Sequence, residues 1–200
     1  MTKKLAIMGS GNGSNFEAIA KFLQGKDVEI TCLSDVKDAF ILKRAQNLGI
    51  SHEFLSFEKN YEYFSKNKFD LVALAGYMKI LDEKTLKKMG NVINIHPSIL
   101  PSFRGKGAIK KAFLAGVKLS GVTIHWVEKE VDKGKIIAQY PVFIENAMSL
   151  DEFEQAIHNV EYKLYPIVIE KLLEDKVFDF QELITPTSNK KCGGCGGCQN

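Results

Sequence analysis

The sequence predicts an α/β domain built on a doubly wound, Rossmann-like, mainly parallel sheet with an antiparallel extension towards its C-terminal end. Over roughly the first hundred residues, short apolar runs alternate with segments of helical periodicity. A glycine-rich loop, Gly9-Ser-Gly-Asn-Gly-Ser-Asn15, follows the first of these runs. Beyond residue 105, two apolar runs are joined only by a short polar connection, which favours antiparallel pairing.

Each predicted element has a sequence pattern behind it. Strands are predicted where β-branched and other apolar residues run together, and helices where apolar residues recur every three or four positions. The predicted strands are 5–8, 28–33, 51–55, 70–75, 92–95, 122–127 and 135–144, and the predicted helices are one that carries Phe16, Ile19, Ala20 and Leu23, then 39–48, 61–67, 83–89, 108–115 and 150–174. Such regular alternation places helices on both faces of a parallel sheet.

Composition limits the class of protein. The chain has 200 residues, of which 45% are hydrophobic and 26% charged, as in a soluble globular protein. No apolar segment is long enough to cross a membrane. A net charge of +3 without a dense Lys/Arg run does not indicate a nucleic-acid partner. The first strand begins without a signal-peptide-like apolar region, so we expect a cytoplasmic enzyme. From the length of the chain, we expect one domain over residues 1–186.

The cysteines do not form a disulfide framework. Cys32 lies in an apolar strand, whereas Cys192, Cys195 and Cys198 crowd a Gly-rich segment, which we interpret as a flexible tail over residues 187–200. The Cys-x-x-Cys-x-x-Cys spacing could hold a soft metal ion, but a fourth ligand is missing nearby. A redox-sensitive, low-complexity tail is the preferred interpretation.

The glycine loop is a candidate anion site. A helix that begins after such a loop presents unpaired backbone N–H groups and the positive end of its dipole, and Gly13, Ser14 and Asn15 would supply the donors. A dinucleotide fingerprint needs a third glycine, but Phe16 stands there, although Asp35 mimics the acidic residue that holds a ribose. Phosphate or phosphoribose binding is therefore favoured over a dinucleotide, and a plain tight turn stays open.

A polar pair ends the fifth predicted strand. Side chains alternate along a strand, so Asn94 and His96 share one face while Ile93 and Ile95 take the other. Ligands of open α/β sheets bind at the carboxyl ends of strands, where this amide and imidazole emerge. A satisfied structural histidine is the alternative.

Two carboxylates could complete a site. Asp132 precedes a glycine in a reversing loop, so it could be a turn residue that bonds its own backbone. If the loop folds over the sheet, Asp132 would instead meet His96 and favour the protonated imidazole. Glu161 flanks the core-facing residues of the last helix and could be a solvated rim residue or could reach a cationic or amine group.

With these motifs in hand, the chain resembles the folate-dependent formyltransferase family, in particular the phosphoribosylglycinamide formyltransferases of purine biosynthesis. The resemblance covers roughly residues 4–185. The matching segments, in family order, are Ser10-Gly-Asn-Gly-Ser-Asn15, Leu74-Ala-Gly-Tyr-Met-Lys-Ile-Leu81, Asn94-Ile-His-Pro-Ser-Ile-Leu-Pro-Ser-Phe103, Gly121-Val-Thr-Ile-His-Trp-Val127, Val131-Asp-Lys-Gly134 and Glu161-Tyr-Lys-Leu-Tyr-Pro166.

The resemblance implies transfer of a formyl group from 10-formyltetrahydrofolate, a co-substrate, to the amine of glycinamide ribonucleotide, with no metal required. It assigns catalysis to Asn94, His96 and Asp132. Gly13, Ser14 and Asn15 would hold the substrate phosphate, and Glu161 the substrate amine. The remaining assignment is a folate pocket formed by Met78, Lys79, Ile80, Leu81, Asn94 and Val131.

Some positions depart from the family pattern. Lys79 stands where an arginine is common, and the segment 104–109 lacks a histidine that many members carry, so that Arg104 or Lys106 would have to substitute. The arginine that binds the folate carboxylate has no clear match in residues 57–60, and the cysteine tail lies outside the pattern.

Three alternatives remain: a formyltetrahydrofolate hydrolase, a formyltransferase that acts on another amine, and a non-catalytic nucleotide-binding module. The expected partners are small-molecule substrates, with no nucleic acid or membrane, and the expected state is a monomer or a homodimer.

Overall fold

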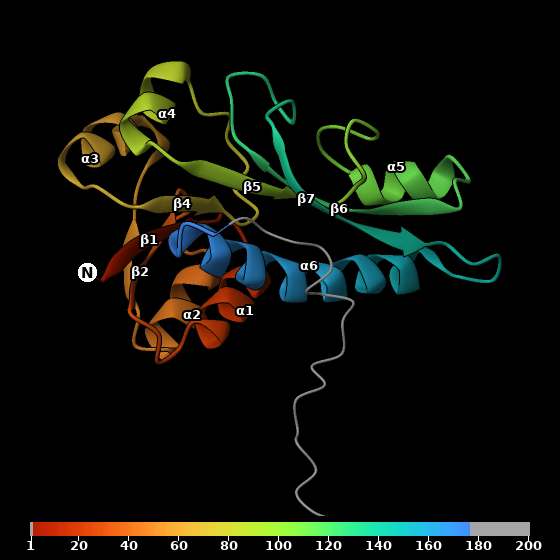
Figure 1. Cartoon of the computed structure of the whole chain (residues 1–200), viewed down its shortest axis with the longest axis horizontal. Coiled ribbons are helices and arrows are strands. Elements are labelled where there is room, and N and C mark those ends of the chain that lie inside the picture. The colour runs from red at the N-terminus through yellow and green to blue at the C-terminus, as the bar shows by residue number, and fades with distance from the viewer. Residues whose placement is uncertain (1, 177–200) are drawn as a thin grey trace, which may run out of the picture.

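A computed structural model describes residues 2–176 as a seven-stranded sheet with helices on both faces (Figure 1). The strand order is β3-β2-β1-β4-β5-β6-β7; the first five strands are parallel, and β6 and β7 are antiparallel to their neighbours. The elements are β1 (Lys3–Met8), α1 (Ser14–Phe22), β2 (Val28–Ser34), α2 (Phe40–Asn47), β3 (Ser51–Phe54), the 3-10 helix η1 (Phe57–Lys59), α3 (Asn60–Lys66), β4 (Leu71–Leu74), α4 (Glu83–Met89), β5 (Val92–His96), α5 (Ala108–Leu114), β6 (Leu119–Trp126), β7 (Ile136–Phe143) and α6 (Leu150–Leu173). The predicted fold class is confirmed.

The boundaries differ from the predicted ones in a few places. The strand predicted to begin at residue 122 begins at Leu119, because Leu119 and Gly121 pair with Phe143 and Pro141 of β7. Cross-strand pairing thus overrides the weak strand preference of this glycine, whose φ is 158° and where an added Cβ would lie 2.1 Å from the carbonyl oxygen of Tyr140. The short helix η1 before α3 was not predicted.

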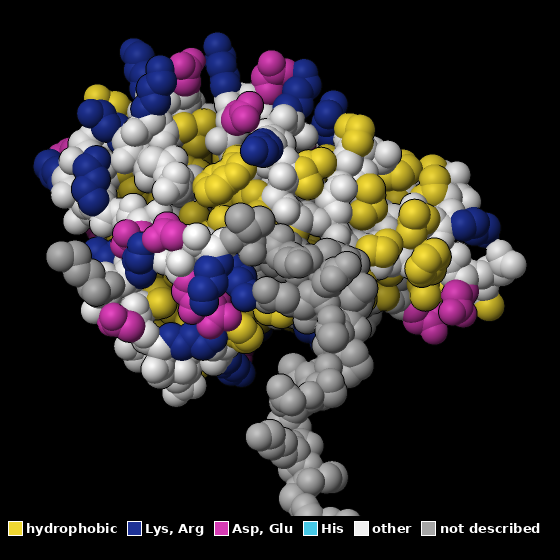
Figure 2. Space-filling view, viewed as in Figure 1, with side chains coloured by type: hydrophobic (Ala, Val, Ile, Leu, Met, Phe, Trp, Pro, Cys, Tyr) yellow, Lys and Arg dark blue, Asp and Glu magenta, His cyan; other side chains and the backbone are white. Residues whose placement is uncertain are grey.

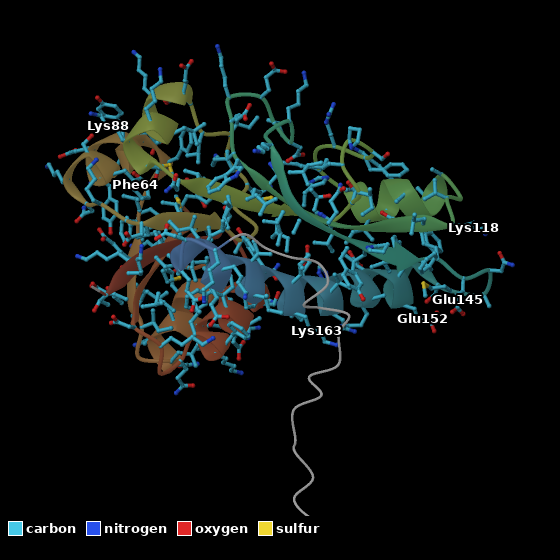
Figure 3. The ribbon with its side chains drawn as sticks, in the orientation of Figure 1. Phe64, Lys88, Lys118, Glu145, Glu152 and Lys163 are labelled. Carbon is cyan, nitrogen blue, oxygen red and sulfur yellow. The ribbon has the colours of Figure 1, made fainter. Side chains whose placement is uncertain are left out.

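Alternation along the inner strand β1 divides the core into two layers. Leu5 and Ile7 belong to a large cluster with side chains from α1, α2, α5 and α6, whereas Ala6 and Met8 belong to a smaller cluster with side chains from α3 and α4. Phe64 of α3 is fully buried in the smaller layer (Figure 3). The period of two along β1 therefore fixes which helices cover which face.

The sheet reverses its winding between β1 and β4. The chain moves from β1 outward to β2 and β3, and then returns to place β4 and β5 on the other side of β1. At such a switch point the loops that follow the two adjacent strands turn away from each other and leave a crevice. Here these loops are the glycine loop after β1 and the turn after β4.

The edge strand β7 is exposed but poorly suited to further strand pairing. Hydrophobic side chains gather over the part of the surface where β6 and β7 lie (Figure 2), and Leu119 and Phe143 are among the exposed large residues. Pro141 in β7 has no backbone N–H to donate, which protects an edge against pairing with another sheet.

The last helix packs against the sheet from β4 to β7. Ser149 and Glu152 form a capping box at the start of α6, and Glu152 lies at the end of the helix farthest from β1 (Figure 3). In the middle of α6, the buried hydroxyl of Tyr165 donates to the carbonyl oxygens of Leu74 (3.0 Å) and Ile93 (3.3 Å), so one side chain joins α6 to both β4 and β5. None of the helices in residues 2–176 is long and apolar enough to cross a membrane.

The predicted domain limit at residue 186 and the predicted tail over 187–200 lie outside the described residues, as do Cys192, Cys195 and Cys198.

Replacing Tyr165 by Phe should lower the free energy of unfolding by about 1–2 kcal/mol, because two buried carbonyls lose a shared donor while the ring volume is kept. Urea denaturation would measure this difference. The control is Tyr61→Phe, because the Tyr61 side chain is 48% exposed and should tolerate the change. An equal effect of the two substitutions would contradict the role of the buried hydroxyl.

Candidate active site

One cavity of about 570 Å³ opens along the carboxyl edge of the parallel strands and contains every predicted site residue. Its size is in the range of small-molecule sites. Its walls come from all parts of the chain: residues 11–15, 74–81, 94–97, 105–108, His125, residues 127–132, His158 and Glu161. The cavity extends from the glycine loop to the turn after β4, across the end of β5.

The glycine loop forms the start of α1 in the predicted way. Gly13 is the N-cap of α1, with φ 77°, and no side chain caps this end of the helix. The first backbone N–H groups of α1 are therefore left without a side-chain partner, in a loop that lines the cavity. A Cβ on Gly13 would lie 2.6 Å from Cβ of Ile41, so the close packing of α2 against the loop requires glycine at this position. The loop can thus receive an anion through its backbone.

A polar cluster lies at the end of β5. Asn94 and His96 share a face as predicted, and their partners across the antiparallel pairing with β6 are His125 and Thr123. Nδ2 of Asn94 donates to Nε2 of His125 (3.3 Å), while Nδ1 of His125 donates to the carbonyl of Trp126 (2.9 Å). A carbonyl can only accept, so Nδ1 of His125 carries a hydrogen and, in the neutral ring, Nε2 is the acceptor that orients the Asn94 amide.

A bulge lies beside His125 in the pairing of β6 with β7. Ile124 pairs with Ala138 and His125 with Ile136, which leaves Ile137 as an extra residue in β7. Bulges increase the local twist and redirect neighbouring side chains, and they are frequent beside active sites.

Asp132 is shared between the two imidazoles. Its Oδ2 lies 3.5 Å from Nδ1 of His96, and its Oδ1 lies 3.6 Å from Nε2 of His125. Oδ2 also accepts from the backbone N–H of Gly105 (2.8 Å), and Nε of Arg104 donates to the Asp132 carbonyl (3.2 Å). Asp132 is 9% exposed and its carboxylate bonds Gly105 rather than its own turn, so of the two alternatives the structure supports the loop folded over the sheet.

The surroundings of Asp132 keep it charged. Burial raises the pKa of this carboxyl, but the contact with His125, the Gly105 N–H and the charge of His96 together lower the pKa below its ordinary value. Asp132 is therefore a fixed negative charge beside both rings.

The second ring nitrogen of His96 is also engaged. Nε2 of His96 donates to the carbonyl of Phe103 (3.0 Å), in a loop where Phe103, Gly105 and Gly107 all have positive φ. A non-glycine residue at φ 54° is strained, so this loop is held by its contacts to Asp132 and His96 rather than by local preference.

Glu161 lines the same cavity from α6. It is 4% exposed, so it is not a solvated rim residue. Its Oε2 accepts from Nδ2 of Asn15 (3.2 Å) and contacts Nδ1 of His158 (2.9 Å). The hydrogen bond to Glu161 raises the pKa of His158, against the effect of its partial burial. Oδ1 of Asn15 is buried without a hydrogen-bond partner in the described part of the chain.

The turn after β4 supplies an apolar wall. Met78 and Ile80 line the cavity and are 57% and 69% exposed, whereas Leu81, which also lines it, is buried. Val131 lines the cavity from the loop after β6 and is 48% exposed. Exposed apolar side chains grouped at a cavity are suited to a flat, partly apolar ligand.

The structure distinguishes the two basic residues that could replace the missing histidine, Arg104 and Lys106. Lys106 lines the cavity, whereas Arg104 lies outside its lining and uses its guanidinium on the Asp132 carbonyl. Residues 2–176 contain no group of three or more His, Cys, Asp or Glu side chains that could hold a metal ion.

Sequence reasoning missed two histidines in the cavity. His125 could not be placed because its relation to Asn94 depends on the register between β5 and β6. His158 precedes Glu161 by three residues on α6, and this helical spacing for an interacting pair is the signal that could have identified it.

The fold and this polar cavity define a formyl transferase: the formyl transferase family model matches residues 3–169, and the chain belongs to this family. More particular relatives are the phosphoribosylglycinamide formyltransferases. The Bacillus subtilis enzyme of that name is 40% identical over 185 residues, covering 86% of this chain and 95% of that protein. The Haemophilus influenzae enzyme of that name is 37% identical, covering 88% of this chain and 89% of that protein.

A solved structure agrees with the assignment. The crystal structure of phosphoribosylglycinamide formyltransferase from Streptococcus pneumoniae superposes with a TM-score of 0.78 and 42% identity, covering 85% of this chain and 98% of that one.

Replacing Gly13 by Ala should lower the free energy of unfolding by about 1 kcal/mol or more, because φ is 77° and the added Cβ would meet Ile41. Gly11→Ala is the matched control in the same loop, since no atom lies within 4 Å of its added Cβ and its φ is not in the left-handed region. Urea unfolding of both variants tests the packing argument, which fails if they are equally stable.

Proposed function

We propose that this protein transfers the formyl group of 10-formyltetrahydrofolate to the amine of phosphoribosylglycinamide in purine biosynthesis. One observation carries the proposal: a single cavity contains both the uncapped start of α1, which is suited to an anion, and the Asn94–His96–Asp132 cluster. Membership of the formyl transferase family, with relatives that carry this name, supports the same reaction.

The acceptor substrate binds, in this proposal, between α1 and α6. Its phosphate meets the backbone N–H groups of Gly13, Ser14 and Asn15, and Lys106, one of the lysines that line the cavity, is the cation assigned to it. Its amine lies beside Glu161 and the unpartnered Oδ1 of Asn15. Two buried acceptors side by side favour a ligand group that donates N–H bonds, because burying either one unpaired is costly.

The formyl donor occupies the other half of the cavity. Met78, Lys79, Ile80 and Leu81 form one wall and Val131 the other, with Asn94 at the end nearest the acceptor substrate. Apolar side chains and backbone groups there are suited to a pteridine ring, which has flat faces and polar edges.

Catalysis follows from charge development at the formyl group. The amine nitrogen attacks the formyl carbon, a C–N bond forms and the carbonyl oxygen becomes an oxyanion that needs donors. The second hydrogen on Nδ2 of Asn94 is one donor, because the first is given to His125. A protonated His96 is the other, with Asp132 stabilising its charge at 3.5 Å.

The tetrahedral centre then collapses. The bond between the formyl carbon and N10 of the folate breaks, the amine gives up one proton, and N10 receives one. Asp132 and a water molecule carry this proton between the two nitrogens in the proposal. For His96 to act as the acid, Nε2 exchanges its hydrogen bond with the Phe103 carbonyl for one with the formyl oxygen.

Other properties remain predictions of the sequence: a cytoplasmic location, a monomer or homodimer, and no nucleic-acid partner. Hydrolysis of the formylfolate, or transfer to another amine, would use the same polar cluster. The acceptor pocket at Glu161 is what favours an amine-bearing phosphate ester.

The decisive assay combines purified protein with 10-formyltetrahydrofolate and phosphoribosylglycinamide, and follows formation of tetrahydrofolate by absorbance. We expect product only when both substrates are present. Equal product without phosphoribosylglycinamide would indicate a hydrolase and overturn the proposal.

His96→Ala and Asp132→Asn should each reduce kcat by about 10²–10⁴-fold, because the first removes the proposed acid and the second removes the charge that stabilises it. Calorimetric titration should still detect phosphoribosylglycinamide binding to both variants. His52→Ala is the control, since this exposed histidine of β3 lies outside the cavity. Near-normal turnover in either site variant would refute the assigned roles.

A further inference from the structure

The loop that follows β1 and the turn that follows β4 are joined by one side chain. The hydroxyl of Ser10 accepts from the backbone N–H of Met78 (2.9 Å) and donates to Oδ1 of Asp35 (2.5 Å). Ser10 thus bridges the crevice at the switch point of the sheet, where β1 and β4 are neighbours. Ser10 itself does not line the cavity; the residues on either side of the crevice do.

The direction of this hydrogen-bond chain is fixed by chemistry. A backbone N–H can only donate, so the Ser10 oxygen must be its acceptor. The single hydroxyl hydrogen of Ser10 is then available for the carboxylate of Asp35, which as an anion can only accept. Each bond orients the next, from Met78 through Ser10 to Asp35. This role also explains Asp35, which the sequence pattern compared with a ribose-binding carboxylate.

The two loops differ in how much else holds them. The glycine loop has further ties: the N–H of Ile41 donates to Gly11 O (3.1 Å), and Nε of Arg44 donates to Asn12 O (2.9 Å). The turn 76–81 has no helix or strand hydrogen bonds of its own in the structure described. It is held by Gly76 O accepting from Ser10 N (3.1 Å), by the Tyr77 hydroxyl accepting from Asn60, and by Met78 N–H.

From this arrangement we propose that Ser10, supported by Asp35, is a positioning residue for the folate half-site: it sets the place of the Met78–Leu81 wall relative to the fixed glycine loop. The inference rests on the proposed function, because it assigns the folate to this wall. Loss of the Ser10 hydroxyl removes one of the hydrogen bonds that hold the turn 76–81, but it leaves the glycine loop in place. Binding of the formyl donor, 10-formyltetrahydrofolate, should therefore weaken, while binding of the acceptor substrate, phosphoribosylglycinamide, stays nearly constant.

The test compares Ser10→Ala with Ser10→Thr, which keeps a hydroxyl, and with Ser65→Ala. Ser65 lies on α3, where its hydroxyl donates to the Tyr61 carbonyl, outside the cavity lining. Titration with tetrahydrofolate, the deformylated product, measures binding to the folate half-site directly. Steady-state kinetics give KM for each substrate and kcat.

We expect Ser10→Ala to raise the Kd for tetrahydrofolate and the KM for 10-formyltetrahydrofolate about two- to tenfold, which corresponds to one net hydrogen bond. KM for phosphoribosylglycinamide should change less than about twofold on the same reasoning, because the glycine loop keeps its other bonds. Ser10→Thr should restore donor binding, and Ser65→Ala should match the wild type. Asp35→Ala removes the partner of the Ser10 hydroxyl but leaves the hydroxyl itself in place. It should therefore weaken folate binding less than Ser10→Ala does.

Two results would overturn the inference. One is an unchanged Kd for tetrahydrofolate in Ser10→Ala. The other is an equal loss of affinity for both substrates together with a lowered melting temperature, which would mean that the substitution destabilises the whole domain. If Ser10→Ala does not fold, the same comparison is made with Asp35→Ala, for which unchanged donor binding would count against the inference. Failure of the proposed function is separate, because wild-type protein would then give no transfer at all.

Discussion

A buried carboxylate that must be given donors organises the chemistry of this protein. Asp132 is 9% exposed, and a charge so little hydrated is costly unless hydrogen bonds and opposite charges surround it. The groups around it come from three places that are distant in sequence: the Gly105 N–H donates to Oδ2, and the imidazoles of His96 on β5 and His125 on β6 lie 3.5 and 3.6 Å from the carboxylate oxygens. Satisfying Asp132 therefore draws the loop after β5 and the loop after β6 together over the strand ends.

The cavity is divided by the kind of hydrogen-bonding group that each end presents. Near α6, Glu161 and Oδ1 of Asn15 are acceptors, and near β5, Asn94 and His96 are sources of hydrogen. A nucleophilic amine donates and a formyl oxygen accepts. The polarity of the cavity thus matches the direction in which the formyl group is proposed to move, and misplacing either substrate would leave buried groups unpaired.

Much of the fold could be predicted because its signals are local. The alternation of apolar runs and helical spacing gave the order of the elements, and the period of two along β5 correctly placed Asn94 beside His96. The site was predicted less evenly. Glu161 and Asp132 each had an ordinary surface interpretation from spacing, and only the tertiary structure shows that both are buried. His125 faces Asn94 because of the register between β5 and β6, which has no local sequence signal.

By itself the sequence determined the α/β class, the glycine loop at the start of α1 and the shared face of Asn94 and His96, because each depends on residues close together in the chain. The tertiary structure decided what those residues meet. It places Asp132 between two imidazoles, Glu161 beside Asn15, and Ser10 between Asp35 and Met78. These contacts depend on strand order, register and loop packing. Burial and hydrogen bonding between residues distant in sequence determine all three, so no local sequence pattern predicts them.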